Sequence, residues 1–162
     1  MDRLAIEGVE LGALLDDRVA GIVGDLAEHW RQSTRLFARV QLRWLSEQAE
    51  CGEVDAPMRR NLLFDHAARR WRDAPPPQPV VAAGVTSASP ALAGLLRVVS
   101  ELPGGAVILP DLDLSLDPEI WEALGHAGIG EGPDDPPFGA EDAFVHPQYH
   151  LKLLLGRMGV QR

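Results

Sequence analysis

The feature that most constrains the fold is a stretch of 27 residues, Asp25 to Cys51, that contains neither glycine nor proline. Gly24 and Asp25 offer an N-cap before it, and Gly52 can terminate it. At about 100° per residue, one side of such a helix collects a mostly apolar stripe. Its members are Leu26, Trp30, Ser33, Phe37, Val40 and Trp44. The stretch predicts one long helix whose apolar stripe packs on a neighbour.

A second stripe of the same predicted helix consists of arginines, namely Arg31, Arg35, Arg39 and Arg43. Such a stripe can follow a nucleic-acid backbone, each phosphate contact releasing counterions, or it can simply be a solvated face. The whole chain carries a net charge of -9, which repels phosphate. The charge is unevenly distributed along the chain. The net charge is -3 for residues 1–24, +1 for residues 25–73 and -7 for residues 74–162. We therefore treat the four arginines as the candidate DNA contacts.

The first part of the chain, residues 1–74, is predicted to be a helical segment. Leu4 to Ile6 followed by Gly8 resembles the last turn of a helix whose start is missing, as in a fragment. Asp55 and Pro57 resemble a cap and first turn, and they open a helix that runs to about Trp71. The prolines at 75–77 then end it.

The second part, residues 75–162, changes in pattern. Short apolar runs at Val80–Ala83 and Ala106–Leu109 flank an apolar helix over Pro90–Leu102. Strand, helix and strand at this spacing predict a βαβ unit whose parallel pair is buried on both faces. The expected fold class is α/β, helix-rich overall, with a short parallel sheet.

Further along this part, Asp117 and Pro118 start a short helix through Leu124. The Gly-, Pro- and acid-rich residues at about 125–145 predict a flexible acidic loop. A last helix is expected over Tyr149–Met158.

The loop from Gly84 to Pro90 lies where α/β proteins bind phosphate through free amides at a helix N-terminus. It lacks the lysine of a P-loop, and the favoured interpretation is a turn in which Ser89 caps the helix that starts at Pro90. Neither a nucleotide site nor any other cofactor site is predicted here.

Carboxylates follow the second predicted strand, at the edge where α/β active sites assemble. They are Asp111, Asp113, Asp117 and Glu119. They could hold magnesium, or they could cap loops; without further ligands, and with Lys152 as the only lysine, capping is favoured. His146 and His150 have a spacing that could bind zinc, but Pro147 places His146 before the helix and no third ligand is evident.

No catalytic residue, metal ligand or cofactor-binding residue is predicted in this chain. The single cysteine, Cys51, excludes an internal disulfide and a CxxC metal site within these residues. A reducing, cytoplasmic location is expected, because no stretch approaches the roughly 18 apolar residues of a membrane span and the first residues lack the apolar run of a signal peptide.

Several segments, in this order, resemble the AddB subunit of the bacterial AddAB helicase-nuclease of alphaproteobacterial type. The matching stretches are Asp25-Leu-Ala-Glu-His-Trp, Arg69-Arg-Trp before the proline run, Pro79-Val-Val-Ala-Ala-Gly-Val-Thr-Ser, Leu102-Pro-Gly-Gly-Ala-Val-Ile-Leu-Pro-Asp-Leu-Asp, and His146-Pro-Gln-Tyr followed by Leu151-Lys-Leu-Leu. No single stretch is diagnostic, but their order and spacing extend over nearly the whole chain.

The resemblance implies an internal fragment of the family's N-terminal, UvrD-like helicase half, with residues 1–74 as a helical insertion and residues 75–162 as the return to its parallel core. It implies a role as scaffold and DNA-contact surface in double-strand break repair, with an AddA-like subunit as partner and no membrane contact. Gly84 and Val85 follow the first strand where an ATPase needs paired acids. The family's nucleotide-binding region, second motor-like domain and iron-sulfur nuclease are absent, so no catalytic residue carries over.

Two other functions fit the residues. One is a stand-alone acidic interaction module that docks a protein partner through Trp30, Phe37 and Trp44. The other is a small magnesium-dependent phosphotransfer enzyme that uses Asp111 and Asp113.

Overall fold

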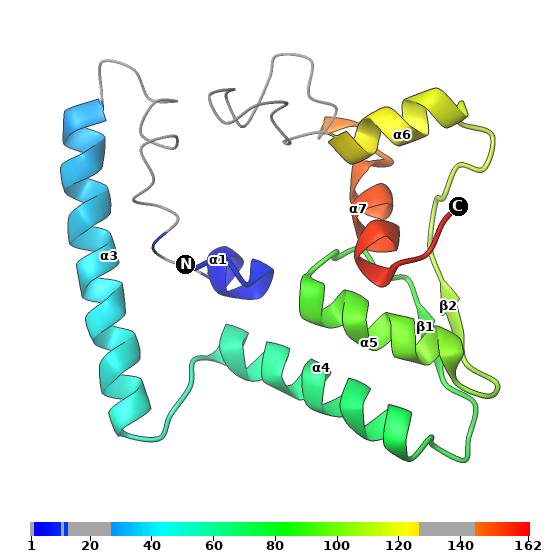
Figure 1. Ribbon diagram of the computed structural model, residues 1–162, viewed down its shortest axis with the longest axis horizontal. Coiled ribbons are helices and arrows are strands. Elements are labelled where there is room, and N and C mark those ends of the chain that lie inside the picture. Colours follow the sequence, from blue (N-terminus) through cyan, green and yellow to red (C-terminus); the bar gives the residue numbers. More distant parts are fainter. Residues whose placement is uncertain (1, 11, 13–26, 127–144) are drawn as a thin grey trace. The chain divides into compact units, whose positions relative to one another are not determined.

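The chain is described here by a computed structural model, which covers residues 2–10, 12, 27–126 and 145–162. It is helix-rich with one two-stranded parallel sheet, so the predicted α/β class is confirmed (Figure 1). The helices are α1 Asp2–Glu7, α3 Ala27–Glu50, α4 Ala56–Asp73, α5 Pro90–Glu101, α6 Pro118–His126 and α7 Tyr149–Met158, and the strands are β1 Val81–Ala83 and β2 Ala106–Ile108. Among these residues, one compact unit extends to Arg59 and a second begins at Arg60.

The first unit contains α1 and the long helix α3, which confirms the helix expected from the glycine- and proline-free stretch. Gly52, with φ of 69°, ends α3 in the left-handed conformation. The amide of Gly52 donates to the carbonyl of Ala49 at 3.1 Å, and that of Glu53 donates to Gln48 at 2.8 Å. This is the Schellman arrangement, which satisfies carbonyls at a helix end. The predicted N-cap, Gly24 and Asp25, lies outside the described residues.

Helix α4 begins as the sequence predicts. The carboxylate of Asp55 accepts a hydrogen bond from the amide of Met58 at 2.7 Å, which satisfies one of the free donors of the first turn. Further along, Ala68 is buried together with Val98 and Leu102 of the βαβ unit. The later turns of α4 therefore belong to the core of the second unit.

The two strands of the second unit pair in parallel, with Val81 opposite Ala106 and Ala83 opposite Ile108, and α5 connects them. Ala82 and Val107, between these positions, pack against the core that α5 contributes to. Val81 and Ile108 point the other way and are more than half exposed, at 57% and 56%. The expectation of a pair buried on both faces is wrong, because helices of this unit cover only one face and successive strand residues alternate between faces.

Helix α7, whose predicted bounds are confirmed, links the pieces of the second core. Leu154 and Met158 join the cluster that includes Ala93 and Leu96 of α5. Leu155 joins a separate cluster with Trp121 and Leu124 of α6. The apolar side chains of α7 thus pack against α5 and α6 on different sides of one helix.

Two further expectations concern the acidic loop and the absence of a membrane-spanning helix. Most of the predicted acidic loop, residues 127–144, lies outside the described residues. Among the helices that are described, none combines the length and apolar character needed to cross a membrane.

Candidate interaction surfaces

The arginine stripe on α3 is exposed where its side chains are described, which are those of Arg35, Arg39 and Arg43. The side chain of Arg31 lies outside the described part. Arg43 donates from Nε to Glu47 at 2.9 Å, in an ion pair whose side chains are 83% and 53% exposed. Within the described residues, Arg35 and Arg39 form no ion pair or hydrogen bond through their side chains. Among the described arginines of α3, these two guanidinium groups are the most available cations.

Carboxylates of the same helix weaken the positive potential of this stripe. Glu28 accepts a hydrogen bond from Gln32 at 3.0 Å, and Glu50 accepts one from Ser46 at 3.4 Å. With Glu47, the sequence of α3 contains three acidic residues and four arginines. The stripe is a mixed surface with a small positive excess, and any phosphate it binds is held by single arginines rather than by a strong field.

The apolar stripe of α3 is also largely uncovered. Trp30 is 44% exposed, Phe37 38%, Val40 57% and Trp44 53%. Among the side chains of the helix that the structure describes, the buried ones are those of Thr34 and Ala38, beside that stripe. The long helix therefore presents a band of large apolar side chains and a band of arginines, both accessible.

A hollow of about 720 Å³ lies next to Trp44 within the first unit. Its apolar lining comes from α1 and the residues after it, from α3 and from the start of α4. These residues include Leu4, Val9, Val40, Trp44, Leu45 and Met58. A hollow of this size and character suits an apolar side chain or small apolar group of a binding partner.

The loop after β1 has one feature that the sequence did not indicate. Ser89 occupies the N-cap position of α5, and its carbonyl accepts the amide of Ala93 at 2.9 Å. Its hydroxyl, however, is buried and makes no hydrogen bond, so the predicted side-chain cap is wrong. The start of α5 is instead favoured by Pro90 at its first position, whose fixed φ suits a helix. Arg157 of α7 donates to the carbonyl of Ala88 in the same loop.

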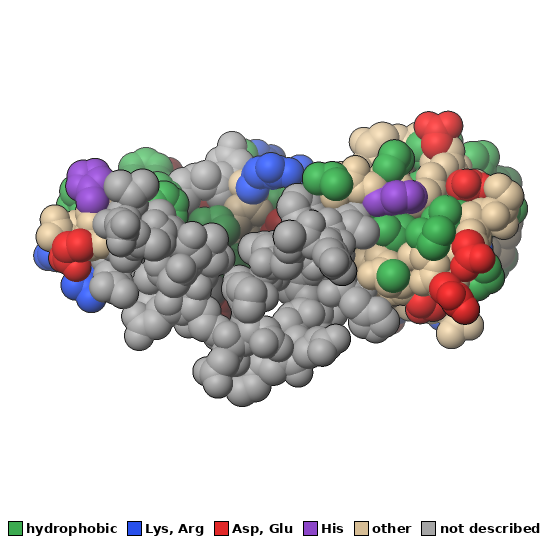
Figure 2. All heavy atoms as spheres, turned by 90° about the horizontal axis from the view of Figure 1, so that it is seen from above, with side chains coloured by type: hydrophobic (Ala, Val, Ile, Leu, Met, Phe, Trp, Pro, Cys, Tyr) green, Lys and Arg blue, Asp and Glu red, His purple; other side chains and the backbone are tan. Residues whose placement is uncertain are grey.

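The carboxylates after β2 cap turns. Asp113 accepts the Ser115 hydroxyl at 2.6 Å and the Ser115 amide at 2.8 Å, and Asp117 accepts the Glu119 amide at 2.7 Å. The Ser115 hydroxyl is the main cause that lowers the pKa of Asp113, followed by the Ser115 amide. Within the described ranges, no three His, Cys, Asp or Glu side chains are placed to hold a metal ion. Figure 2 shows acidic side chains scattered among hydrophobic ones on the surface of the second unit.

The two histidines have separate roles. His146 precedes α7, as its neighbour Pro147 predicts, and its Nδ1 accepts the Gln148 amide at 3.1 Å. His150 lies within α7, where its ring is 5.6 Å from that of Tyr149.

One group of side chains was missed by the sequence reasoning, because Trp121 lies more than 30 residues from the other two members, Lys152 and Arg162. The ring of Trp121 lies 5.1 Å from Lys152 Nζ and 4.9 Å from Arg162 Cζ. Only the basic character of Lys152 and Arg162 in an acidic segment could have drawn attention to them.

Comparison with known protein families, with curated proteins and with solved structures finds no match to this chain.

Proposed function

We propose that the chain is a scaffold segment of an AddB-like subunit, within an ATP-dependent helicase-nuclease that processes DNA double-strand ends for recombinational repair. It has no active site of its own in this proposal. Residues 1–74 are the helical insertion, and residues 75–162 carry two strands of a UvrD-like core. The support for the family is the ordered set of matching sequence segments.

The single observation that carries the scaffold role is that both the apolar band and the arginine band of α3 are exposed. A 24-residue helix with Trp44 and Val40 more than half exposed leaves apolar area that a protein neighbour could bury. Burial of such a side chain contributes about 1.5–3 kcal/mol. The arginine band, in which Arg35 and Arg39 form no ion pair with another described residue, suits a nearby phosphate backbone. A helix between a protein neighbour and DNA needs these two bands.

The test is association with an AddA-like subunit and with blunt duplex ends. We expect Val40→Ala with Trp44→Ala to weaken the protein association at least tenfold and leave duplex binding by the complex unchanged. Arg35→Ala with Arg39→Ala should weaken duplex binding and lower its salt dependence by about two phosphate contacts. Gln32→Ala, exposed on the same helix, is the control.

Two outcomes would count against the proposal. One is a chain that binds neither the AddA-like subunit nor duplex ends under conditions where an intact AddB-like subunit binds both. The other is an equal loss in the double variants and in the Gln32 control.

A stand-alone acidic interaction module is the second candidate, and the hollow beside Trp44 favours it. In this case Trp30, Phe37 and Trp44 dock a protein partner without DNA. Partner binding that is lost with Trp44→Ala, persists at high salt and is unaffected by removal of Arg35 and Arg39 would favour this function over the first.

A further inference from the structure

A second hollow, of about 690 Å³, lies in the second unit between α6 and the end of α7. Its walls include the apolar side chains Pro118, Leu155 and Val160, and its charged residues are Glu122, Lys152 and Arg162. Trp121 also lines it. The hollow is large enough for a small organic molecule.

Two cations converge on this hollow in a segment that is otherwise acidic. Residues 74–162 carry a net charge of -7 and contain four basic side chains. Because basic side chains are rare in this segment, their frequency alone does not explain why two of them lie at one hollow. Lys152 Nζ lies 5.1 Å and Arg162 Cζ 4.9 Å from the centre of the Trp121 ring. The two charges are therefore at most about 10 Å apart, within roughly one Debye length, and they repel each other.

The carboxylate next to Lys152 compensates the charge of this lysine incompletely. Glu122 Oε1 lies 3.0 Å from Lys152 Nζ in an ion pair, but the Glu122 side chain is 68% exposed, and such a pair contributes little in water. The Lys152 side chain itself is only 18% exposed. Because Lys152 is more buried than Glu122, an anion of a ligand can replace Glu122 as the partner of Lys152.

Both cations also keep free donors. Lys152 has three N–H groups, and Glu122 is its one ion-pair partner among the described residues. Arg162 has five, and it donates to the carbonyls of Asp113 at 3.1 Å and Leu116 at 2.6 Å. These carbonyl bonds hold the guanidinium over Trp121 while other N–H groups stay available.

We propose that this hollow binds a phosphomonoester, with the phosphate between Lys152 and Arg162 and the organic part against Pro118, Leu155 and Val160. The ligand phosphate replaces Glu122 as the partner of Lys152. This inference rests on contacts within the second unit and not on the function proposed above. A free nucleotide and the 5′-phosphate end of a DNA strand share the chemistry that the hollow would recognise.

The test uses the full chain, with adenosine 5′-monophosphate as the probe and adenosine as the uncharged control, followed by NMR shifts and calorimetry. We expect the monophosphate to bind with a Kd below about 1 mM and adenosine to bind at least tenfold more weakly. Lys152→Met, which keeps the aliphatic part of the side chain, should weaken monophosphate binding about tenfold or more. Arg69→Ala, an exposed arginine of α4 that does not line the hollow, should change nothing.

Glu122→Gln separates a binding role from a structural one. It removes the competing anion, so the monophosphate should bind roughly two- to fivefold more tightly even though the ion pair is lost. Arg162→Gln should weaken binding, and it keeps the proposal testable if Lys152→Met fails to fold.

The proposal is overturned by any of three results: no monophosphate binding at several millimolar, adenosine binding as tight as the monophosphate, or equal or weaker binding in Glu122→Gln. A single-stranded oligonucleotide with and without a 5′-phosphate distinguishes the two ligand sources. A gain in affinity on phosphorylation identifies a DNA end, whereas binding of the free nucleotide alone identifies the nucleotide, and each of these supports a phosphate site.

Discussion

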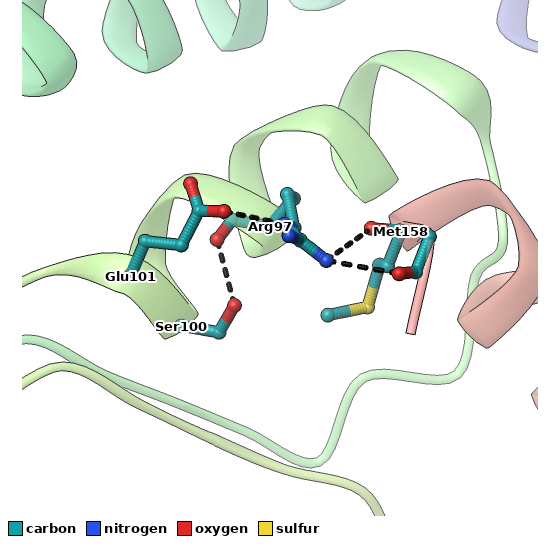
Figure 3. Close-up of polar contacts among 5 residues, drawn as sticks. Arg97, Ser100, Glu101 and Met158 are labelled. Carbon is teal, nitrogen blue, oxygen red and sulfur yellow. Dashed lines mark hydrogen bonds and ion pairs between the residues drawn. The ribbon is translucent and has the colours of Figure 1, made fainter. Parts of the chain in front are cut away.

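Arg97 Nη1, on α5, donates a hydrogen bond to the carbonyl of Gly159 at 2.9 Å, 62 positions further along the chain. The same nitrogen donates to the carbonyl of Met158 at 3.3 Å (Figure 3). Both acceptors lie at the C-terminal end of α7, where carbonyls lack partners within the helix and carry partial negative charge. One guanidinium therefore joins the helix of the βαβ unit to the end of the last helix.

Arg97→Met should lower the free energy of unfolding by about 1–3 kcal/mol, because it removes two charge-assisted hydrogen bonds to the end of α7, of which the one to Met158 is partly buried. Urea unfolding followed by circular dichroism measures this. The matched control is Glu101→Gln, which removes the exposed partner of the Arg97–Glu101 ion pair at 2.6 Å and should cost less than about 0.5 kcal/mol. Equal effects of the two changes would show that the bonds to α7 contribute nothing.

Gly105 permits the close turn between α5 and β2. A Cβ at this position would overlap the carbonyl oxygen of Val99 and lie 2.9 Å from Leu102 Cβ. Gly105→Ala should therefore destabilise the fold by several kcal/mol, since backbone must shift to relieve the overlap. Gly94→Ala, inside α5 where an added Cβ meets nothing within 4 Å, should instead stabilise the chain by about 0.5–1 kcal/mol. Thermal unfolding compares the two, and melting temperatures that shift in the same direction would refute this account.

Gln148 holds the loop after β2 against α7. Its Nε2 donates to the carbonyl of Asp111 at 2.8 Å, and its Oε1 accepts the amide of Asp113 at 3.1 Å. Gln148 is 8% exposed and both bonds are partly buried, so Gln148→Ala should leave these two backbone groups without their partner and cost about 0.5–1.5 kcal/mol. Hydrogen exchange should show faster exchange of the Asp113 amide in particular. Gln161→Ala, at an exposed position, is the control, and an unchanged Asp113 amide in Gln148→Ala would contradict the role of the bond.

The lowered pKa of Asp113 predicts how the Asp113–Ser115 turn responds to acid. A carboxyl whose pKa is lower in the folded than in the unfolded chain stabilises the fold at pH values above the unfolded pKa. This contribution is lost as the pH falls through the folded pKa, which is below about pH 4. Ser115→Ala removes the hydroxyl that is the largest cause of the lowered pKa, so the pKa of Asp113 should rise. Carboxyl NMR titration measures it, and Ser100→Ala, whose hydroxyl bonds only to the carbonyl of Arg97, is the control. An Asp113 pKa that is the same in Ser115→Ala and the parent chain would contradict the assigned cause.

The positions of the helices could be predicted because helix ends are defined by residues that are close together in the sequence. The caps at Asp55 and Asp117 and the glycine stop at Gly52 act within three residues of the helix ends they define, so their meaning can be read without the fold. The parallel pairing of the two apolar runs followed from the length of the connecting helix. The resemblance to the AddB family and the DNA-contact role of the α3 arginines stay predictions.

Packing decided the rest. The sequence does not show that the outer side chains Val81 and Ile108 lie uncovered, because an apolar run looks the same whether one or both faces of a strand are buried. Nor does it show that the Ser89 hydroxyl is buried without a partner.

The candidate phosphate site is the clearest case of this division. The sequence alone determined the charges of Lys152 and Arg162 and the ring of Trp121. Only the tertiary structure decided that they meet at one hollow, since they are brought together by the packing of α6 on α7. Local signals depend on backbone geometry over a few residues, whereas a site of this kind depends on which apolar faces bury each other.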